Sequence, residues 1–172
     1  MKPFDDNIIL IGMPACGKST VGVLLAKTLG MDFLDTDLLI QTRTGKRLST
    51  LIEERGMEGF VQLESDLVST LRPRRTVLAT GGSVVLGAAG MAHLKTLGRV
   101  VYLRVPPDTV EQRIGDITAR GVVIAPGKTI FDVYRARTPL YEAAADLTVD
   151  SDGTAEQTVT TLAAILESGA DS

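Results

Sequence analysis

The chain has 172 residues, of which 44% are hydrophobic and 23% are charged, and its formal net charge is −3. These values are typical of a globular protein, and we expect residues 1–172 to form a single domain. The mild acidity argues against a nucleic-acid partner, and the lack of a long apolar run argues against a membrane partner. Because Cys16 is the only cysteine and the apolar run near the N-terminus is too short for a signal peptide, we expect a soluble, cytoplasmic protein.

Short apolar runs alternate with amphipathic stretches along the whole chain. In chain order, the pattern predicts a strand at 8–11, a helix at 18–29, a strand at 33–35, helices at 37–44, 48–55 and 59–71, a strand at 76–80, a helix at 88–97, a strand at 99–105, helices at 108–114 and 129–144, a strand at 147–150 and a helix at 154–168. This alternation predicts an α/β fold, in which a parallel sheet is covered by helices on both faces as a three-layer sandwich.

The first strand runs directly into GMPACGKST, residues 12–20, which matches the Walker A pattern G-x-x-x-x-G-K-[ST]. Backbone N–H groups of such a loop and the N-terminus of the following helix form a concavity that binds phosphate. We expect Lys18 to contact the β- and γ-phosphates of ATP and Ser19 to bind Mg²⁺. The expected ATP contacts in this loop are Gly12, Ala15, Cys16, Gly17, Lys18, Ser19 and Thr20. Cys16 is interpreted as a small filler residue with no catalytic role.

Asn7 is the only asparagine in the chain. The guanine-recognition motif of switch GTPases and the catalytic loop of protein kinases both need an asparagine beyond the phosphate loop, so both classes are excluded. The remaining interpretation is a small phosphotransferase that moves the γ-phosphate of ATP onto a small molecule.

Two carboxylates, Asp35 and Asp37, follow the second predicted strand. The carboxyl ends of parallel strands line the ligand crevice, and period-two geometry predicts that both side chains lie on the same side of the chain. One carboxylate would hold Mg²⁺ through water, and the other would accept a proton from an attacking hydroxyl. An alternative role for Asp37 is to cap the N-terminus of the next helix.

Seven segments together resemble the shikimate kinases of the nucleoside-monophosphate-kinase-like group, in order and in spacing: GMPACGKSTVG, FLDTD, RTGKRLSTLIEERGMEGFVQLES, VLATGGS, VVYL, EQRIGDITARG and RARTPLYEAAADLTVD. The resemblance covers nearly the whole chain. It implies a five-stranded sheet of order 2-3-1-4-5, an acceptor-binding segment at about 37–62, a lid at about 115–128 and a monomer. It also implies ATP-dependent phosphorylation of a small hydroxy acid, with shikimate as the first candidate.

The catalytic and metal-binding roles of this family map onto five residues. Lys18 matches the phosphate-binding lysine and Ser19 the Mg²⁺ hydroxyl. Asp35 matches the outer-sphere Mg²⁺ aspartate, while Asp37 matches the residue that binds the acceptor hydroxyls and serves as base. Arg120 matches the lid arginine that reaches the transferring phosphate.

The binding roles map onto a second set of residues. The backbone of Gly81 and Gly82 matches the glycine run that contacts the acceptor, and Glu64 matches an acid that orients an acceptor-binding arginine. Arg113 matches an arginine near the adenine, although a plain surface charge is an alternative. Arg137 matches an arginine that grips the acceptor carboxylate with its planar fork.

The chain departs from the family pattern at three places. Val61 follows Phe60 where the family usually has an arginine that anchors the acceptor carboxylate. Ser83 replaces the last glycine of a triple-glycine run, and residues 120–123 read RGVV instead of the usual RPLL. The first two departures concern the acceptor pocket, so we expect the ATP apparatus to be intact and the acceptor site to be altered at Val61.

Loss of one charged hydrogen bond without replacement would weaken shikimate binding by about ten- to a hundredfold. Arg43, Arg47 or Arg55 could instead supply the missing cation. A divergent enzyme acting on homoserine or a sugar acid such as gluconate is therefore kept as an alternative. A non-catalytic nucleotide-binding regulatory module is the alternative from another class.

Overall fold

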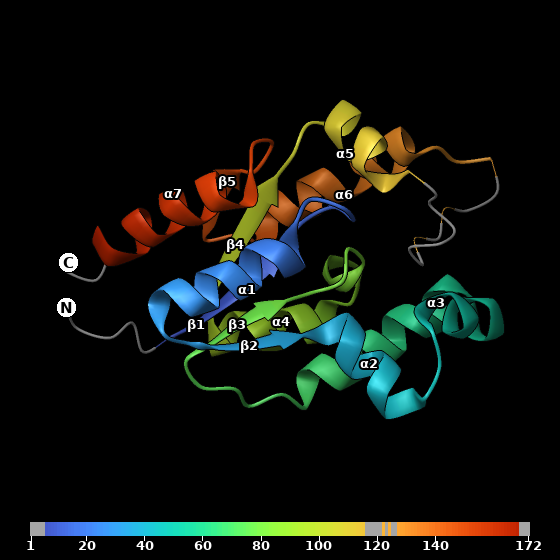
Figure 1. The fold of residues 1–172 in the computed structure, drawn as a ribbon. Coiled ribbons are helices and arrows are strands. Elements are labelled where there is room, and N and C mark those ends of the chain that lie inside the picture. Colours follow the sequence, from blue (N-terminus) through green and yellow to red (C-terminus); the bar gives the residue numbers. More distant parts are fainter. Residues whose placement is uncertain (1–5, 116–121, 123, 125–126, 169–172) are drawn as a thin grey trace.

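The computed structural model describes residues 6–115, 122, 124 and 127–168 (Figure 1). The described strands are β1 (Asn7–Ile11), β2 (Asp32–Asp35), β3 (Thr76–Ala79), β4 (Gly98–Arg104) and β5 (Leu147–Asp150). The described helices are α1 (Lys18–Leu29), α2 (Thr36–Thr44), α3 (Leu48–Ser69), α4 (Ala88–Leu97), α5 (Pro107–Ile114), α6 (Ile130–Ala144) and α7 (Ala155–Ser168), with a short 3₁₀ helix, η1 (Val84–Leu86).

The strands form one parallel sheet in the order β2-β3-β1-β4-β5, which confirms the predicted fold class and strand order. The central strand β1 pairs on both sides, with Leu10 opposite Ala79 of β3 and Val101 of β4. Its residues 8–11 are all fully buried, as expected for a parallel strand covered on both faces. Figure 1 shows α1 and α7 on one face of the sheet and α4 and α6 on the other.

Most predicted helices are confirmed to within one or two residues at their ends. The two helices predicted at 48–55 and 59–71 form α3, in which Gly56 has non-helical backbone angles (φ 71°, ψ 174°) and breaks the helical geometry. The turn η1 was not predicted, because a three-residue helix leaves no periodic signal in the sequence. Among the described helices, none combines the length and the apolar character needed to cross a bilayer.

The carboxyl ends of three neighbouring strands bring the expected functional segments to one edge of the sheet. β1 leads into the phosphate loop, β2 ends at Asp35, and β3 leads into the turn at 80–83. Helices α2 and α3 follow β2 and project beyond this edge (Figure 1). The expected lid at about 115–128 lies mostly outside the described residues.

Candidate active site

The phosphate loop between β1 and α1 has the backbone that its glycines predict. Gly12, Ala15 and Gly17 all have positive φ angles, of 148°, 62° and 96°. A Cβ at Gly12 would lie 2.7 Å from the carbonyl oxygen of Leu103, so this position requires glycine. Gly17 caps α1 without a side-chain hydrogen bond. The first N–H groups of α1 therefore receive no capping side chain and are suited to binding an anion.

Lys18 lies at the floor of this loop. Its side chain is 7% exposed, and its ammonium group donates hydrogen bonds to the carbonyl oxygens of Gly12 (2.7 Å) and Met13 (2.8 Å). The loop thus holds a nearly buried positive charge against its own carbonyl groups, close to where its N–H groups would receive phosphate.

Ser19 and Asp35 converge from α1 and from the end of β2. The Ser19 hydroxyl donates to Asp35 Oδ2 at 2.6 Å, and Asp35 Oδ1 accepts from the backbone N–H groups of Asp37 (2.9 Å) and Leu38 (3.1 Å). Asp35 is therefore the N-cap of α2, so the alternative that Asp37 caps this helix is wrong. The period-two argument also fails for Asp37, because β2 ends at Asp35 and Asp37 lies in the first turn of α2.

Hydroxyl and carboxylate oxygens are the ligands that Mg²⁺ prefers, so the Ser19–Asp35 pair fits that ion. Within the described residues, no group of three or more His, Cys, Asp or Glu side chains is arranged to hold a metal. A pair of protein oxygens completed by substrate phosphates and water is the usual form of a Mg²⁺ site in phosphotransferases.

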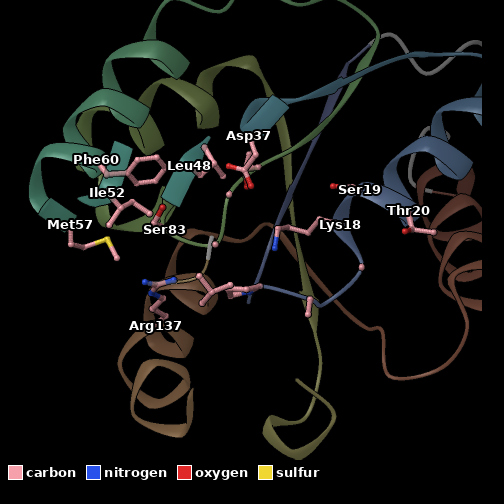
Figure 2. Close-up of a pocket in the computed structure, with 17 residues that line it drawn as sticks. Lys18, Ser19, Thr20, Asp37, Leu48, Ile52, Met57, Phe60, Ser83 and Arg137 are labelled. Atoms are coloured by element: carbon pink, nitrogen blue, oxygen red, sulfur yellow. The ribbon is translucent and has the colours of Figure 1, made fainter. Parts of the chain in front are cut away.

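A cavity of about 290 Å³ opens beside the phosphate loop. Figure 2 shows that Lys18, Asp37 and Arg137 reach it from three different helices. Its lining residues are Pro14, Ala15, Gly17, Lys18, Ser19, Thr20, Asp37, Leu48, Ile52, Met57, Phe60, Thr80, Gly81, Gly82, Ser83, Val122 and Arg137. Burial raises the pKa of Asp37 to about 6, with Asp35 adding to the rise and Lys18 opposing it. A carboxyl group poised in this range is suited to proton transfer.

One wall of this cavity is apolar, and sequence reasoning did not identify it. Leu48, Ile52, Met57 and Phe60 of α3 line it opposite the polar groups of the loop (Figure 2). The available signal was the helical spacing of apolar residues in 48–60, which predicted helices but did not show that these side chains line a cavity. Such a wall can pack against the hydrocarbon part of a small acceptor.

The turn after β3 is confined on three sides. A Cβ at Gly81 would lie 2.5 Å from Glu64 Oε1 and 2.7 Å from Asp37 Oδ1, and a Cβ at Gly82 would lie 2.8 Å from the ring of Pro14. The Tyr141 hydroxyl donates a hydrogen bond to the carbonyl oxygen of Gly82. The turn is therefore held between two carboxyl groups, the phosphate loop and α6, and sequence reasoning missed the contribution of Tyr141.

Glu64 and Ser83 form a buried hydrogen-bonded pair at the back of the turn. The Ser83 hydroxyl donates to Glu64 Oε2 at 2.7 Å. Glu64 Oε1 is also buried, and it has no hydrogen-bond partner among the described residues. Burial raises the pKa of Glu64 to about 7, against the opposing effect of the Ser83 hydrogen bond. Both positions had been noted in the sequence, but nothing in it showed that they pair.

Arg137 lines the cavity from α6 and is 7% exposed. Among the described residues it is the only arginine at the cavity wall, so Arg43, Arg47 and Arg55 do not replace the family's second arginine there. Val61 is half-buried beside Phe60 and does not line the cavity itself. The described residues thus place one guanidinium group, that of Arg137, on the acceptor side of the site.

A second cavity, of about 340 Å³, lies on the other side of the loop and is lined by Cys16, Arg113, Ser151 and Gly153 among others. The Arg113 guanidinium donates to the carbonyl oxygens of Ser151 (3.1 Å), Asp152 (3.0 Å) and Gly153 (3.2 Å). Arg113 is therefore not an isolated surface charge, because it holds the loop after β5 against this cavity. Arg120 lies outside the described residues.

Comparisons with known proteins agree with this geometry. The family model described as shikimate kinase matches residues 14–167. The chain is 38% identical over 164 residues to the shikimate kinase of Thiobacillus denitrificans, covering 94% of this chain and 88% of that one. It is 39% identical over 170 residues to the shikimate kinase of Nitratidesulfovibrio vulgaris, covering 93% and 95%.

Among solved structures, the shikimate kinase of Acinetobacter baumannii in complex with shikimate superimposes with a TM-score of 0.88 at 33% identity, covering 97% of this chain and 96% of that one. A family model that spans most of the chain, together with relatives of this identity and coverage, establishes the family. The chain therefore belongs to the shikimate kinase family.

Proposed function

We propose that this chain is an ATP-dependent shikimate kinase, which transfers the γ-phosphate of ATP to a hydroxyl group of shikimate. The observation that carries the proposal is the single cavity shared by Lys18 of the phosphate loop, Asp37 and Arg137. A phosphate-binding group, a proton acceptor and a carboxylate-binding group are thereby brought to one space of small-molecule size.

ATP binds over residues 12–20 in this proposal. The loop N–H groups receive its phosphates, and Lys18 exchanges its contacts with the carbonyl oxygens of Gly12 and Met13 for the β- and γ-phosphates. The cavity beside Arg113 accepts the base. Ser19 and Asp35 would hold Mg²⁺, which when bound offsets charge on the phosphates.

The acceptor lies in the cavity of about 290 Å³. Its ring packs on the wall formed by Ile52 and Phe60, and its carboxylate accepts hydrogen bonds from Arg137. Asp37 accepts the proton of the attacking hydroxyl, and the backbone of the Gly81–Gly82 turn contacts the acceptor.

Arg120 reaches the transferring phosphate from a lid at about 115–128, and residues 37–62 form the acceptor-binding segment. We assign the chain as a single domain that acts as a monomer in the cytoplasm. Light scattering coupled to size-exclusion chromatography tests the oligomeric state, because a dimer would double the expected mass.

Steady-state turnover of ATP with shikimate, homoserine and gluconate as separate acceptors tests the function. The proposal predicts phosphorylation of shikimate and little turnover of the other two. A preference for homoserine or gluconate would instead support a divergent acceptor. Two observations favour that alternative: Val61 stands where the family has an arginine, and Arg137 is the one arginine that the described residues place at the cavity wall. Tight ATP binding without phosphorylation of any acceptor would indicate a non-catalytic nucleotide-binding module.

A further inference from the structure

Glu64 is a buried carboxyl group beside the acceptor cavity, and no ion-pair partner is found for it among the described residues. It is 1% exposed, and only its Oε2 atom receives a hydrogen bond, from Ser83 at 2.7 Å. Its Oε1 atom is buried without a partner in the described part of the chain. An ionised carboxylate in such a place is costly, so the environment favours the neutral acid.

The free oxygen of Glu64 lies on the side of the reacting groups. The position that a Cβ would take at Gly81 is 2.5 Å from Glu64 Oε1 and 2.7 Å from Asp37 Oδ1, so the two carboxyl groups flank the same glycine. The charged groups that act on Glu64 are Asp37 of α2, Arg137 of α6 and Lys18 of α1. Glu64 therefore contributes to the charge that an incoming acceptor meets.

The charge of this region depends on the proton of Glu64. Asp37 is mostly ionised above its own pKa of about 6. With Asp37 and Glu64 both ionised, two carboxylates oppose the two cations Lys18 and Arg137, and the acceptor brings one more carboxylate. When Glu64 is neutral, the same region has a surplus of one positive charge. Val61, the α3 residue that follows the cavity-lining Phe60, supplies no cation.

We propose that Glu64 is a positioning residue that holds a proton when the acceptor carboxylate binds, so that acceptor binding is linked to proton uptake from solvent. The inference rests on the proposed function, with shikimate as the acceptor. An added negative charge favours the neutral form of a nearby acid, which gives the linkage its direction. The acceptor acts on Glu64 through the shared electrostatic field, since Glu64 itself does not line the cavity.

The linkage predicts a defined pH dependence. Because burial raises the pKa of Glu64 to about 7, it is mostly protonated at pH 6 and mostly ionised at pH 8, whereas a typical acceptor carboxylate is ionised at both. The KM for shikimate should rise about tenfold from pH 6 to pH 8. Calorimetric titration with shikimate, in two buffers of different ionisation enthalpy, should show uptake of about one proton at pH 8 and almost none at pH 6.

Three variants separate this linkage from a merely structural role. In Glu64→Gln the side chain at position 64 no longer titrates. The KM for shikimate of this variant should therefore lack the rise toward pH 8 that ionisation of Glu64 causes. Asp66→Asn, which changes an exposed carboxylate on the same helix but outside the acceptor-binding segment, should keep the wild-type profile. Ser83→Ala removes the hydrogen bond that lowers the pKa of Glu64, so the rise in KM should move to higher pH.

Thermal unfolding of the ligand-free protein provides a readout that does not involve activity. The folded pKa of Glu64 is raised from its ordinary value of 4.5, so its contribution to stability is complete below that value and is lost as the pH rises through about 7. The Tm of the wild type should therefore fall relative to that of Glu64→Gln between pH 5 and pH 8.

A wild-type KM that stays within about twofold from pH 6 to pH 8, with no proton uptake, would overturn the inference while leaving the kinase assignment intact. The same conclusion would follow if Glu64→Gln kept the wild-type profile. Failure to bind or phosphorylate shikimate at any pH, with normal ATP binding, would refute the proposed function and this inference with it. If Glu64→Gln does not fold, two measurements still test the linkage. They are the calorimetric proton uptake of the wild type and the displacement of the rise in KM to higher pH in Ser83→Ala.

Discussion

A single methyl group at Gly81 should disable the acceptor site without unfolding the protein. The Cβ of an alanine there would lie 2.5 Å from Glu64 Oε1 and 2.7 Å from Asp37 Oδ1, so both carboxyl groups would have to move by several tenths of an ångström. Gly81 has no positive φ angle, so the perturbation is steric and not a backbone penalty. Displacement of a reacting group by about 1 Å typically costs about a hundredfold in rate.

We therefore expect Gly81→Ala to lower kcat/KM for shikimate by about ten- to a hundredfold, or about 1.4–2.7 kcal/mol in transition-state stabilisation. The KM for ATP should stay within about twofold, because the phosphate loop is not displaced. A coupled assay of ADP release measures both, with calorimetric ATP binding as an independent check.

Gly30→Ala is the matched control for this variant. Gly30 caps α1 with φ 64°, and a Cβ there would meet no atom within 4 Å. Alanine in this left-handed conformation should cost about 1 kcal/mol of stability and leave the kinetics unchanged. If Gly81→Ala kept wild-type kcat/KM with a normal Tm, the confined arrangement of the two carboxyl groups around Gly81 would be wrong.

Three other substitutions test separate contacts. Arg137→Lys keeps the charge but loses the planar fork, so the KM for shikimate should rise about tenfold or more in steady-state assays while the KM for ATP is unchanged. Asp35→Ala removes the cap of α2 and the acceptor of the Ser19 hydroxyl. It should lower stability by about 0.5–2 kcal/mol in denaturant titration and raise the Mg²⁺ concentration needed for half-maximal activity. Tyr141→Phe keeps the stacking on Tyr102 but removes the hydrogen bond to Gly82. It should lower Tm by a few degrees and raise the KM for shikimate, and an unchanged Tm and KM would show that this bond does not hold the turn.

The fold was largely predictable because its signals are local. Buried β strands, amphipathic helices and the glycines of the phosphate loop each leave a pattern within a few consecutive residues. The departure was equally local in cause, because η1 is too short to show a period. The two helices predicted on either side of Gly56 are confirmed, since the non-helical backbone of Gly56 separates the two helical parts of α3. The strand order came from resemblance to a family, since no short-range pattern encodes which strands are neighbours.

The candidate site was predictable only as a set of residue types. The amino-acid pattern alone indicates that residues 12–20 form a phosphate loop, that Asp35 and Asp37 follow a strand end, and that Arg137 lies on a helix. The positions of side chains in the folded protein show that Asp35 caps α2, that Ser83 pairs with Glu64, and that no other described arginine joins Arg137 at the cavity wall. These facts depend on where side chains from separate elements meet, and packing against a shared core sets that meeting point.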